Sequence, residues 1–184
     1  MAEERALAGK IILETDRLRL REMTRGDFCA LCEILRDSRV MYAYEGAFEE
    51  AEVRDWLEKQ LNNYRCRGFG LWAVILKASS TMIGQCGLTL QEWATTEVLE
   101  VGYLFNKAYW RQGYATEAAV ACREYAFGRL RAKEVFSIIR DGNTASQNVA
   151  LRNGMTLRGE FVKHYRGVVM PHLVYSVKNP KNEE

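Results

Sequence analysis

Apolar and charged residues alternate near the start of the chain and then give way to helical spacing. Residues 17–21 read Arg-Leu-Arg-Leu-Arg, which predicts a strand with one face on the core and one in water. Thr24 and Asp27 have the spacing of a capping box, so we expect a helix from there to about residue 35. Apolar residues at three- and four-residue steps predict a second helix over about 48–64.

The middle of the chain carries three β-type runs, at 71–76, 82–90 and 98–105. The polar stretches 78–80 and 91–97 separate these runs, which predicts an antiparallel meander. A glycine inside such a run weakens the strand unless a bulge or a close backbone approach requires it. We expect such a role for the glycines of these runs: Gly84, Gly87 and Gly102.

Helical and strand patterns alternate in the last third of the chain. Small residues after Gly113 predict a helix to about residue 130, and residues 135–139 predict a further strand. Three more elements complete the pattern: a short helix over 146–153 and strands at about 157–162 and 173–177.

This order of elements predicts an α/β fold with a mixed, mostly antiparallel central sheet of about seven strands and about four helices. The unit from 98 to 139 is strand, helix and strand, and such a connection makes its two strands parallel. The 184 residues, 48% of them apolar, suit one domain over 1–184. We expect its ends, about 1–14 and 178–184, to be poorly ordered.

Charge and composition exclude several classes of partner. The 26 basic and 24 acidic residues are spread along the chain, so we expect no nucleic-acid and no membrane partner. The apolar runs fall short of the roughly 18 to 20 residues of a membrane span, and the start of the chain lacks the apolar stretch of a secretory signal, so we expect a cytoplasmic protein. Five irregularly spaced cysteines suit reduced thiols, and with only His164 and His172 present we expect no metal site.

Residues 100–119 combine a strand, a short turn and the first turns of a helix, which is a layout suited to an anion. The first amides of a helix have no intrahelical acceptor and lie at the positive end of its dipole, so they can hold a diphosphate. Gly113 lets the backbone approach the phosphates, and Ala115 keeps the entrance clear. Taken alone, Gly113 favours the start of an ordinary helix.

The same stretch resembles the acetyl-CoA-binding motif of the GCN5-related N-acetyltransferase (GNAT) superfamily. It reads Glu-Val-Gly-Tyr from residue 100, Tyr-Trp at 109–110 and Gly-Tyr-Ala-Thr-Glu-Ala from residue 113. Trp110 replaces the usual leading Gln or Arg, a variation similar to the ribosomal-protein N-terminal (alanine/serine) acetyltransferase branch. The resemblance implies the acyl-CoA N-acyltransferase fold and acetyl-CoA as co-substrate. It also implies main-chain contacts to acetyl-CoA, from Tyr103, Leu104 and Phe105 to the pantetheine arm and from Arg111, Gln112, Gly113, Tyr114, Ala115 and Thr116 to the diphosphate.

Residues 143–155 resemble the family's N-x-x-S/A motif, with Met155 where a Phe is usual. The resemblance implies that Asn143 contacts CoA, while local physics makes Asn143 or Ser146 the cap of the short helix. Many members use a tyrosine as general acid at the position that Ala150 occupies here. Ser146 is therefore the candidate to stabilise the leaving thiolate.

Glu100 is the candidate base, because it is the only acid within its strand and the resemblance places a glutamate there. The alternative is a residue on the strand face that forms an ion pair. We expect the thioester carbonyl to be polarised by a main-chain N–H where the strands 98–105 and 135–139 splay, an opening that a bulge at Gly102 would allow.

The acceptor amine is less well defined. An α-amino group, with a pKa of about 7.7 to 8.0, is partly neutral at neutral pH, whereas a lysine is almost wholly protonated, so a weak base suits a protein N-terminus. In one interpretation an acidic, aromatic mouth for a cationic amine is lined by Tyr42, Tyr44, Glu45, Phe48 and Glu49; in the other these residues form an ordinary loop and helix start.

We therefore predict an acetyl-CoA-dependent N-acetyltransferase that acts on a primary amine, such as a protein N-terminal α-amino group, by direct attack in a ternary complex. One alternative is acetyl transfer to a small-molecule amine, either a polyamine or an aminoglycoside-like compound. Another is a CoA-binding sensor without turnover. The sequence is compatible with a monomer and with a homodimer.

Overall fold

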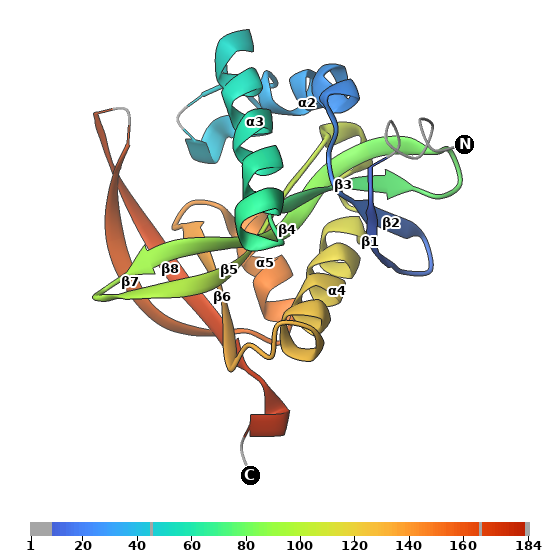
Figure 1. Ribbon diagram of the computed structural model, residues 1–184. Coiled ribbons are helices and arrows are strands. Elements are labelled where there is room, and N and C mark those ends of the chain that lie inside the picture. Colours follow the sequence, from blue (N-terminus) through green and yellow to red (C-terminus); the bar gives the residue numbers. More distant parts are fainter. Residues whose placement is uncertain (1–8, 45, 166, 183–184) are drawn as a thin grey trace.

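The protein folds around one mixed sheet, seen in a computed structural model that describes residues 9–44, 46–165 and 167–182 (Figure 1). Its eight strands lie in the order β1-β2-β3-β4-β5-β6-β8-β7. The strands are β1 (Ile11–Glu14), β2 (Leu18–Arg21), β3 (Leu71–Leu76), β4 (Thr81–Trp93), β5 (Thr96–Phe105), β6 (Glu134–Arg140), β7 (Thr156–Tyr165) and β8 (Val168–Lys178). The α-helices of the described residues are α2 (Phe28–Leu35), α3 (Glu50–Arg67), α4 (Tyr114–Gly128) and α5 (Thr144–Arg152). The predicted α/β fold is confirmed, with one strand more than expected.

The two larger hydrophobic cores lie on the two faces of the sheet, and a third, smaller one joins β5, β6 and β8. Strand β3 is buried on both faces, so its apolar residues alternate between the two larger cores. Leu71, Ala73 and Ile75 pack with α2 and α3, whereas Trp72 and Val74 pack with α4 and α5. Within the described residues, no helix combines the length and the apolar character that crossing a membrane requires.

Strands β5 and β6 are parallel, as the connection through α4 predicted. Their backbone pairing is limited to Glu100 opposite Phe136, whereas β4 and β5 pair continuously from Gly84 opposite Phe105 to the end of the hairpin. The sheet therefore opens between β5 and β6 beyond that single pair.

Two expectations about the limits of elements were wrong. Ile11–Glu14, which we expected in a poorly ordered end, forms β1, because Ile12 and Leu13 pack against the core under α4. The polar stretch 91–97, expected as a loop, continues the β4–β5 hairpin to Trp93 opposite Thr96. The centre of the Trp93 ring lies 5.6 Å from that of Phe136 on β6, and this packing extends the hairpin beyond its apolar part.

The expectation of a poorly ordered end was also wrong for 178–182, because Lys178 ends β8, Asn179 is buried and bonded to Ala132 and Lys133, and Pro180–Asn182 form a short 3-10 helix. The expectations for 1–8 and 183–184 fall outside the described residues.

The glycines of β4 and β5 have different roles. The expected bulge at Gly102 is wrong, because the β4–β5 register passes from Gly102 to Gly87 without a shift. The opening lies on the other edge of β5. The expected close approach is confirmed at Gly87, where a Cβ atom would overlap the carbonyl oxygen of Gly70 and lie 2.8 Å from the Cα atom of Leu71.

We predict that Gly87→Ala lowers the free energy of unfolding by about 2 kcal/mol or more, because β3 and β4 must separate to admit one methyl group. Urea denaturation measures this loss. Gly128→Ala is the control: nothing lies within 4 Å of the added Cβ atom, and alanine favours the helix. An unchanged free energy of unfolding for Gly87→Ala would contradict the packing of these strands.

Candidate functional site

Side chains bridge β5 and β6 where backbone pairing ends. The Glu100 carboxylate accepts a hydrogen bond from the Ile138 amide at 3.1 Å and one from the Thr89 hydroxyl at 3.0 Å. The Ser137 hydroxyl donates to the carbonyl oxygen of Val101 at 2.9 Å. These bonds hold the two strands together without closing the opening, and they place Glu100 at its inner end.

The environment of Glu100 favours its protonated form. Burial raises the pKa of this carboxyl above its ordinary value of 4.5, while the charge of Lys163 and the hydrogen bonds from Ile138 and Thr89 act in the opposite direction. Both carboxylate oxygens bind neutral donors, and a carboxylate has lone pairs for further donors. The ionised Glu100 carboxylate therefore has lone pairs left that can take up a proton.

A pocket of about 600 Å³ lies at this opening. Its walls come from α3, from the strands β4, β5 and β6, from the β7–β8 hairpin and from the start of α5. It brings together several residues that the sequence singled out: Tyr44, Glu100, Tyr103, Leu104, Asn143 and Ser146.

The start of α5 forms one wall of this pocket. Asn143 caps the helix, as predicted, because its side-chain oxygen accepts from the Ser146 amide at 3.1 Å. The same oxygen accepts a hydrogen bond of 2.6 Å from the Tyr42 hydroxyl. The Tyr103 hydroxyl donates to the Ser146 carbonyl at 2.8 Å and so joins β5 to α5. The loop, the strand and the helix thus fix the position of Ser146.

The start of α4 suits a diphosphate. The Trp110 indole donates to the Phe105 carbonyl at 2.8 Å and fixes the turn to the end of β5. Arg111 and Gly113 have the left-handed φ values +60° and +82°, and no side chain caps the helix. Uncapped first amides can bind the oxygens of an anion. These amides belong to Tyr114, Ala115 and Thr116.

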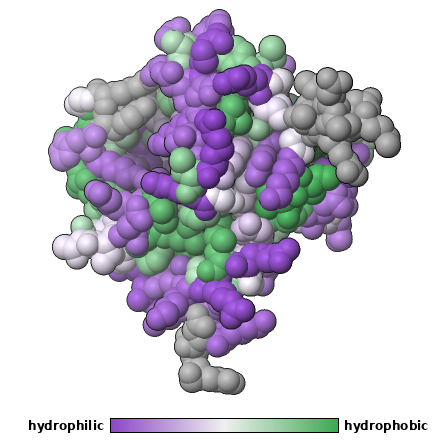
Figure 2. All heavy atoms as spheres, in the orientation of Figure 1, coloured by the Kyte–Doolittle hydropathy of each residue, from purple (hydrophilic) through white to green (hydrophobic). Residues whose placement is uncertain are grey.

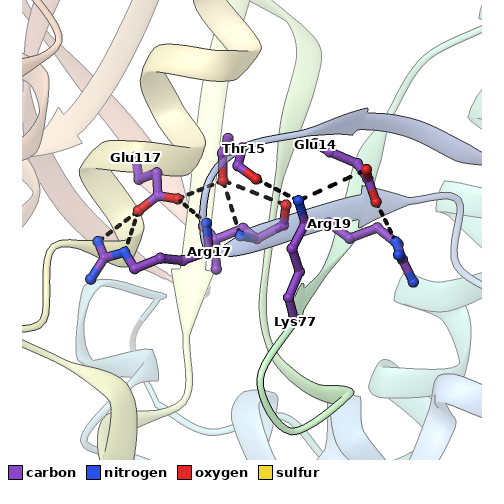
Figure 3. A network of polar contacts seen from close by, with 7 residues as sticks. Glu14, Thr15, Arg17, Arg19, Lys77 and Glu117 are labelled. Carbon is purple, nitrogen blue, oxygen red and sulfur yellow. Dashed lines mark hydrogen bonds and ion pairs between the residues drawn. The ribbon is translucent and has the colours of Figure 1, made fainter.

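A cluster of polar contacts ties this helix start to the β1–β2 turn (Figure 3). The Glu117 carboxylate accepts from the Thr15 hydroxyl at 2.5 Å and from the Arg17 guanidinium at 2.6 Å. Arg17 also donates to the Gln112 carbonyl at 3.0 Å, and its guanidinium lies 4.5 Å from the centre of the Tyr114 ring. Burial raises the pKa of Glu117, but the bonds from Thr15 and Arg17 outweigh it and lower the pKa overall.

The residues expected at the acceptor mouth lie in different places. Tyr44 lines the pocket, whereas Tyr42 bonds to Asn143 beside it. Glu45 lies outside the described residues. Phe48 and Glu49 are not among the residues that line the pocket: Phe48 is buried in the core beside α2 and α3, and Glu49 is the N-cap residue of α3.

The sequence pointed to Glu100 but not to the residues that hold it. Ser137 and Thr89 carry no signal of their own, because each is one polar residue in an apolar strand pattern. Arg17 read as the outward residue of an alternating strand, and only the fold shows that it binds the turn before α4.

Comparison with known proteins gives a consistent assignment. The chain matches the family model described as an acetyltransferase (GNAT) domain over residues 17–156. It is 35% identical over 171 residues to the uncharacterized protein YkkB of Bacillus subtilis (strain 168). The matched stretch covers 92% of this chain and 97% of YkkB.

Solved structures share the fold. A crystal structure of the acetyltransferase from Agrobacterium tumefaciens str. C58 has a TM-score of 0.77 and 28% identity, over 91% of this chain and 94% of that one. The ribosomal L7/L12 α-N-protein acetyltransferase RimL, in complex with coenzyme A, has a TM-score of 0.75 and 19% identity, over 92% and 98% of the two chains.

The matched family region contains the opening between β5 and β6 and the uncapped start of α4. The described residues fit a bound diphosphate at that helix start, since the amides are free of side-chain caps. The chain therefore belongs to the GNAT acetyltransferase family and is an N-acetyltransferase that uses acetyl-CoA.

Proposed function

We propose that the acceptor is a primary amine and that it attacks the acetyl group directly, in a ternary complex with acetyl-CoA. The observation that supports this proposal is the shared pocket at the β5–β6 opening, which Glu100 and Ser146 both line. A proton acceptor and a hydroxyl donor thus face one space. Two substrates can meet there without a covalent enzyme intermediate.

We propose that the main chain from Arg111 to Thr116 holds the diphosphate and that Tyr103 to Phe105 pair with the pantetheine arm. The support is the uncapped start of α4 and the edge of β5 that β6 leaves unpaired beyond Glu100. In this proposal Asn143 holds the same arm from the start of α5. Bound acetyl-CoA supplies an activated acetyl thioester.

The side chains then have separate roles in the transfer. The Glu100 carboxylate takes a proton from the amine, directly or through water, as the new nitrogen–carbon bond forms. The Ser146 hydroxyl donates a hydrogen bond to the sulfur as the carbon–sulfur bond breaks. A carboxylate that already accepts two hydrogen bonds is a modest base, which suits an α-amino group that is partly neutral at neutral pH.

We predict that Gly113→Glu abolishes acetyl-CoA binding in calorimetry. The new carboxylate would stand among the free amides, and the left-handed φ of +82° is strained for a residue with a side chain. Gly113→Asn separates charge from strain, because asparagine tolerates this conformation, and it should retain binding. Gly128→Glu, with the same change at the other end of α4, should also retain it. Unchanged affinity in Gly113→Glu would refute the diphosphate site.

We predict that Glu100→Gln lowers kcat/KM by about 100-fold at neutral pH, because the amide cannot take a proton. In the unsubstituted enzyme kcat/KM should rise with pH through the pKa of Glu100, above 4.5, and the variant should lack this rise. Glu97→Gln, an exposed change on the same strand, is the matched control. Identical pH profiles of the Glu100→Gln variant and the unsubstituted enzyme would remove Glu100 from the mechanism.

The same substitution tests the protonation of Glu100 without activity. Because its pKa is raised in the folded chain, the folded state holds this proton more tightly than the unfolded state does. The resulting stabilisation is fully present below about pH 4.5 and is lost as the pH rises through the folded pKa. Urea denaturation between about pH 4 and about pH 8 should show this decline, and Glu100→Gln should flatten it. An unchanged slope in the variant would count against the raised pKa.

We predict that Ser146→Ala lowers kcat more than it weakens acetyl-CoA binding, because the hydroxyl acts on the departing sulfur. Thiol release with a panel of amines and N-terminally free peptides gives kcat, and mass spectrometry identifies the acetylated atom. Equal kcat values in the two proteins would exclude Ser146. Acetyl-CoA binding without thiol release to any amine would overturn the proposed function.

A further inference from the structure

The charges around the pocket are distributed unevenly between its floor and its rim. Glu100 is the one acid among the described residues that line it, and it lies at the inner end of the β5–β6 opening. The basic side chains and histidines that line it are Lys59, Arg67, Arg140, Lys163, His164 and His172. We call the exposed or half-buried cations at its mouth, Lys59, Arg67 and Lys163, the basic rim of the pocket. An acceptor therefore passes this rim before it reaches the proposed base.

Helix α3 supplies one side of this rim. Lys59, Asn63 and Arg67 follow one another at four-residue steps, which places them on one face of the helix, and all three line the pocket. Lys59 and Arg67 are exposed, and no salt bridge joins either to another described residue. Figure 2 shows a largely hydrophilic surface around this helix.

Two other arginines at α3 are, by contrast, held in ion pairs with glutamates of this helix. Arg54 forms an ion pair of 3.1 Å with Glu50 on the helix itself, and Arg25 pairs with Glu58 at 2.9 Å. These two charges are balanced locally, whereas those of Lys59 and Arg67 are left for a ligand.

Strand β7 supplies the other side of the rim. Lys163 is half-buried, and its Nζ atom lies 5.5 Å from the centre of the Phe161 ring. Burial raises the pKa of Glu100, and the charge of Lys163 opposes that rise, so Lys163 acts on the space in front of Glu100. His164 is exposed beside it and also lines the pocket.

We infer that the acceptor amine carries one or more anionic groups, which bind Lys59, Arg67 and Lys163 while the amine points to Glu100. This inference rests on the proposed transfer to an amine. A carboxylate or phosphate satisfies the rim, and a positive potential there favours the neutral, reactive form of the amine. A polyamine would instead meet like charge at Lys59, Arg67 and Lys163. The rim thus selects against the polycationic acceptors that the sequence left open.

An acceptor panel tests the inference. It contains peptides of equal length with a free N-terminus and acidic, neutral or basic side chains, together with glutamate, an amino-sugar phosphate and spermidine. We expect kcat/KM to be at least about tenfold higher for anionic than for cationic members and to fall as salt increases. The peptide arm and the small-molecule arm distinguish the two sources of the anion.

Charge reversal assigns the effect to these residues. Lys59→Glu combined with Arg67→Glu should lower kcat/KM for the acidic peptide about tenfold, mainly through KM, and should raise it for the basic peptide. Lys163→Glu should act in the same direction. Arg65→Glu is the matched control, because Arg65 lies on α3 but does not line this pocket, and it should change neither value.

The outcomes separate the two proposals. Turnover that is equal for anionic and cationic amines, or highest for spermidine, overturns the inference and leaves the N-acetyltransferase mechanism intact. Unchanged acceptor preference after charge reversal also overturns it. Acetyl-CoA binding with no thiol release to any member of the panel overturns the proposed function and the inference together.

Discussion

The opening between β5 and β6 is the feature on which the site depends. A parallel pair in the middle of a sheet normally keeps its backbone hydrogen bonds, but here the register is reduced to Glu100 opposite Phe136. Side chains replace the missing bonds, since Glu100 binds the Ile138 amide and the Ser137 hydroxyl binds the Val101 carbonyl. The pocket exists because these contacts hold the strands at their base and leave them apart beyond it.

The site at the start of α4 needs a different kind of support. The left-handed backbone conformation of Arg111 costs about 1 to 2 kcal/mol, and the rest of the structure must offset it. The ion pair between Arg17 and Glu117 is half-exposed on the arginine side, and such pairs contribute at most about 1 kcal/mol. Its main effect is therefore positional, because Arg17 also donates to the carbonyl oxygen of Gln112 and so fixes the turn before α4.

The structural role of Glu100 and the chemical role that we propose for it oppose each other. Its hydrogen bonds join two strands, yet its burial disfavours the ionised form that a base requires. The charge of Lys163 at the rim shifts this balance toward the carboxylate. In our proposals, one charge distribution both supports the base and selects among acceptors.

The sequence by itself determined the helices, most strand positions, the parallel connection through α4 and the motif at its start, because these follow from local periodicity and short-range spacing. Tertiary structure alone decided which side chains hold β5 to β6, how Arg17 reaches Glu117, and that Lys59 and Lys163 face one pocket. Each of these pairs is far apart in the chain, and single polar residues carry no sign of their partner. The β4–β5 hairpin was misjudged for the same reason, since the packing of Trp93 against Phe136 outweighs the polar character of its local sequence.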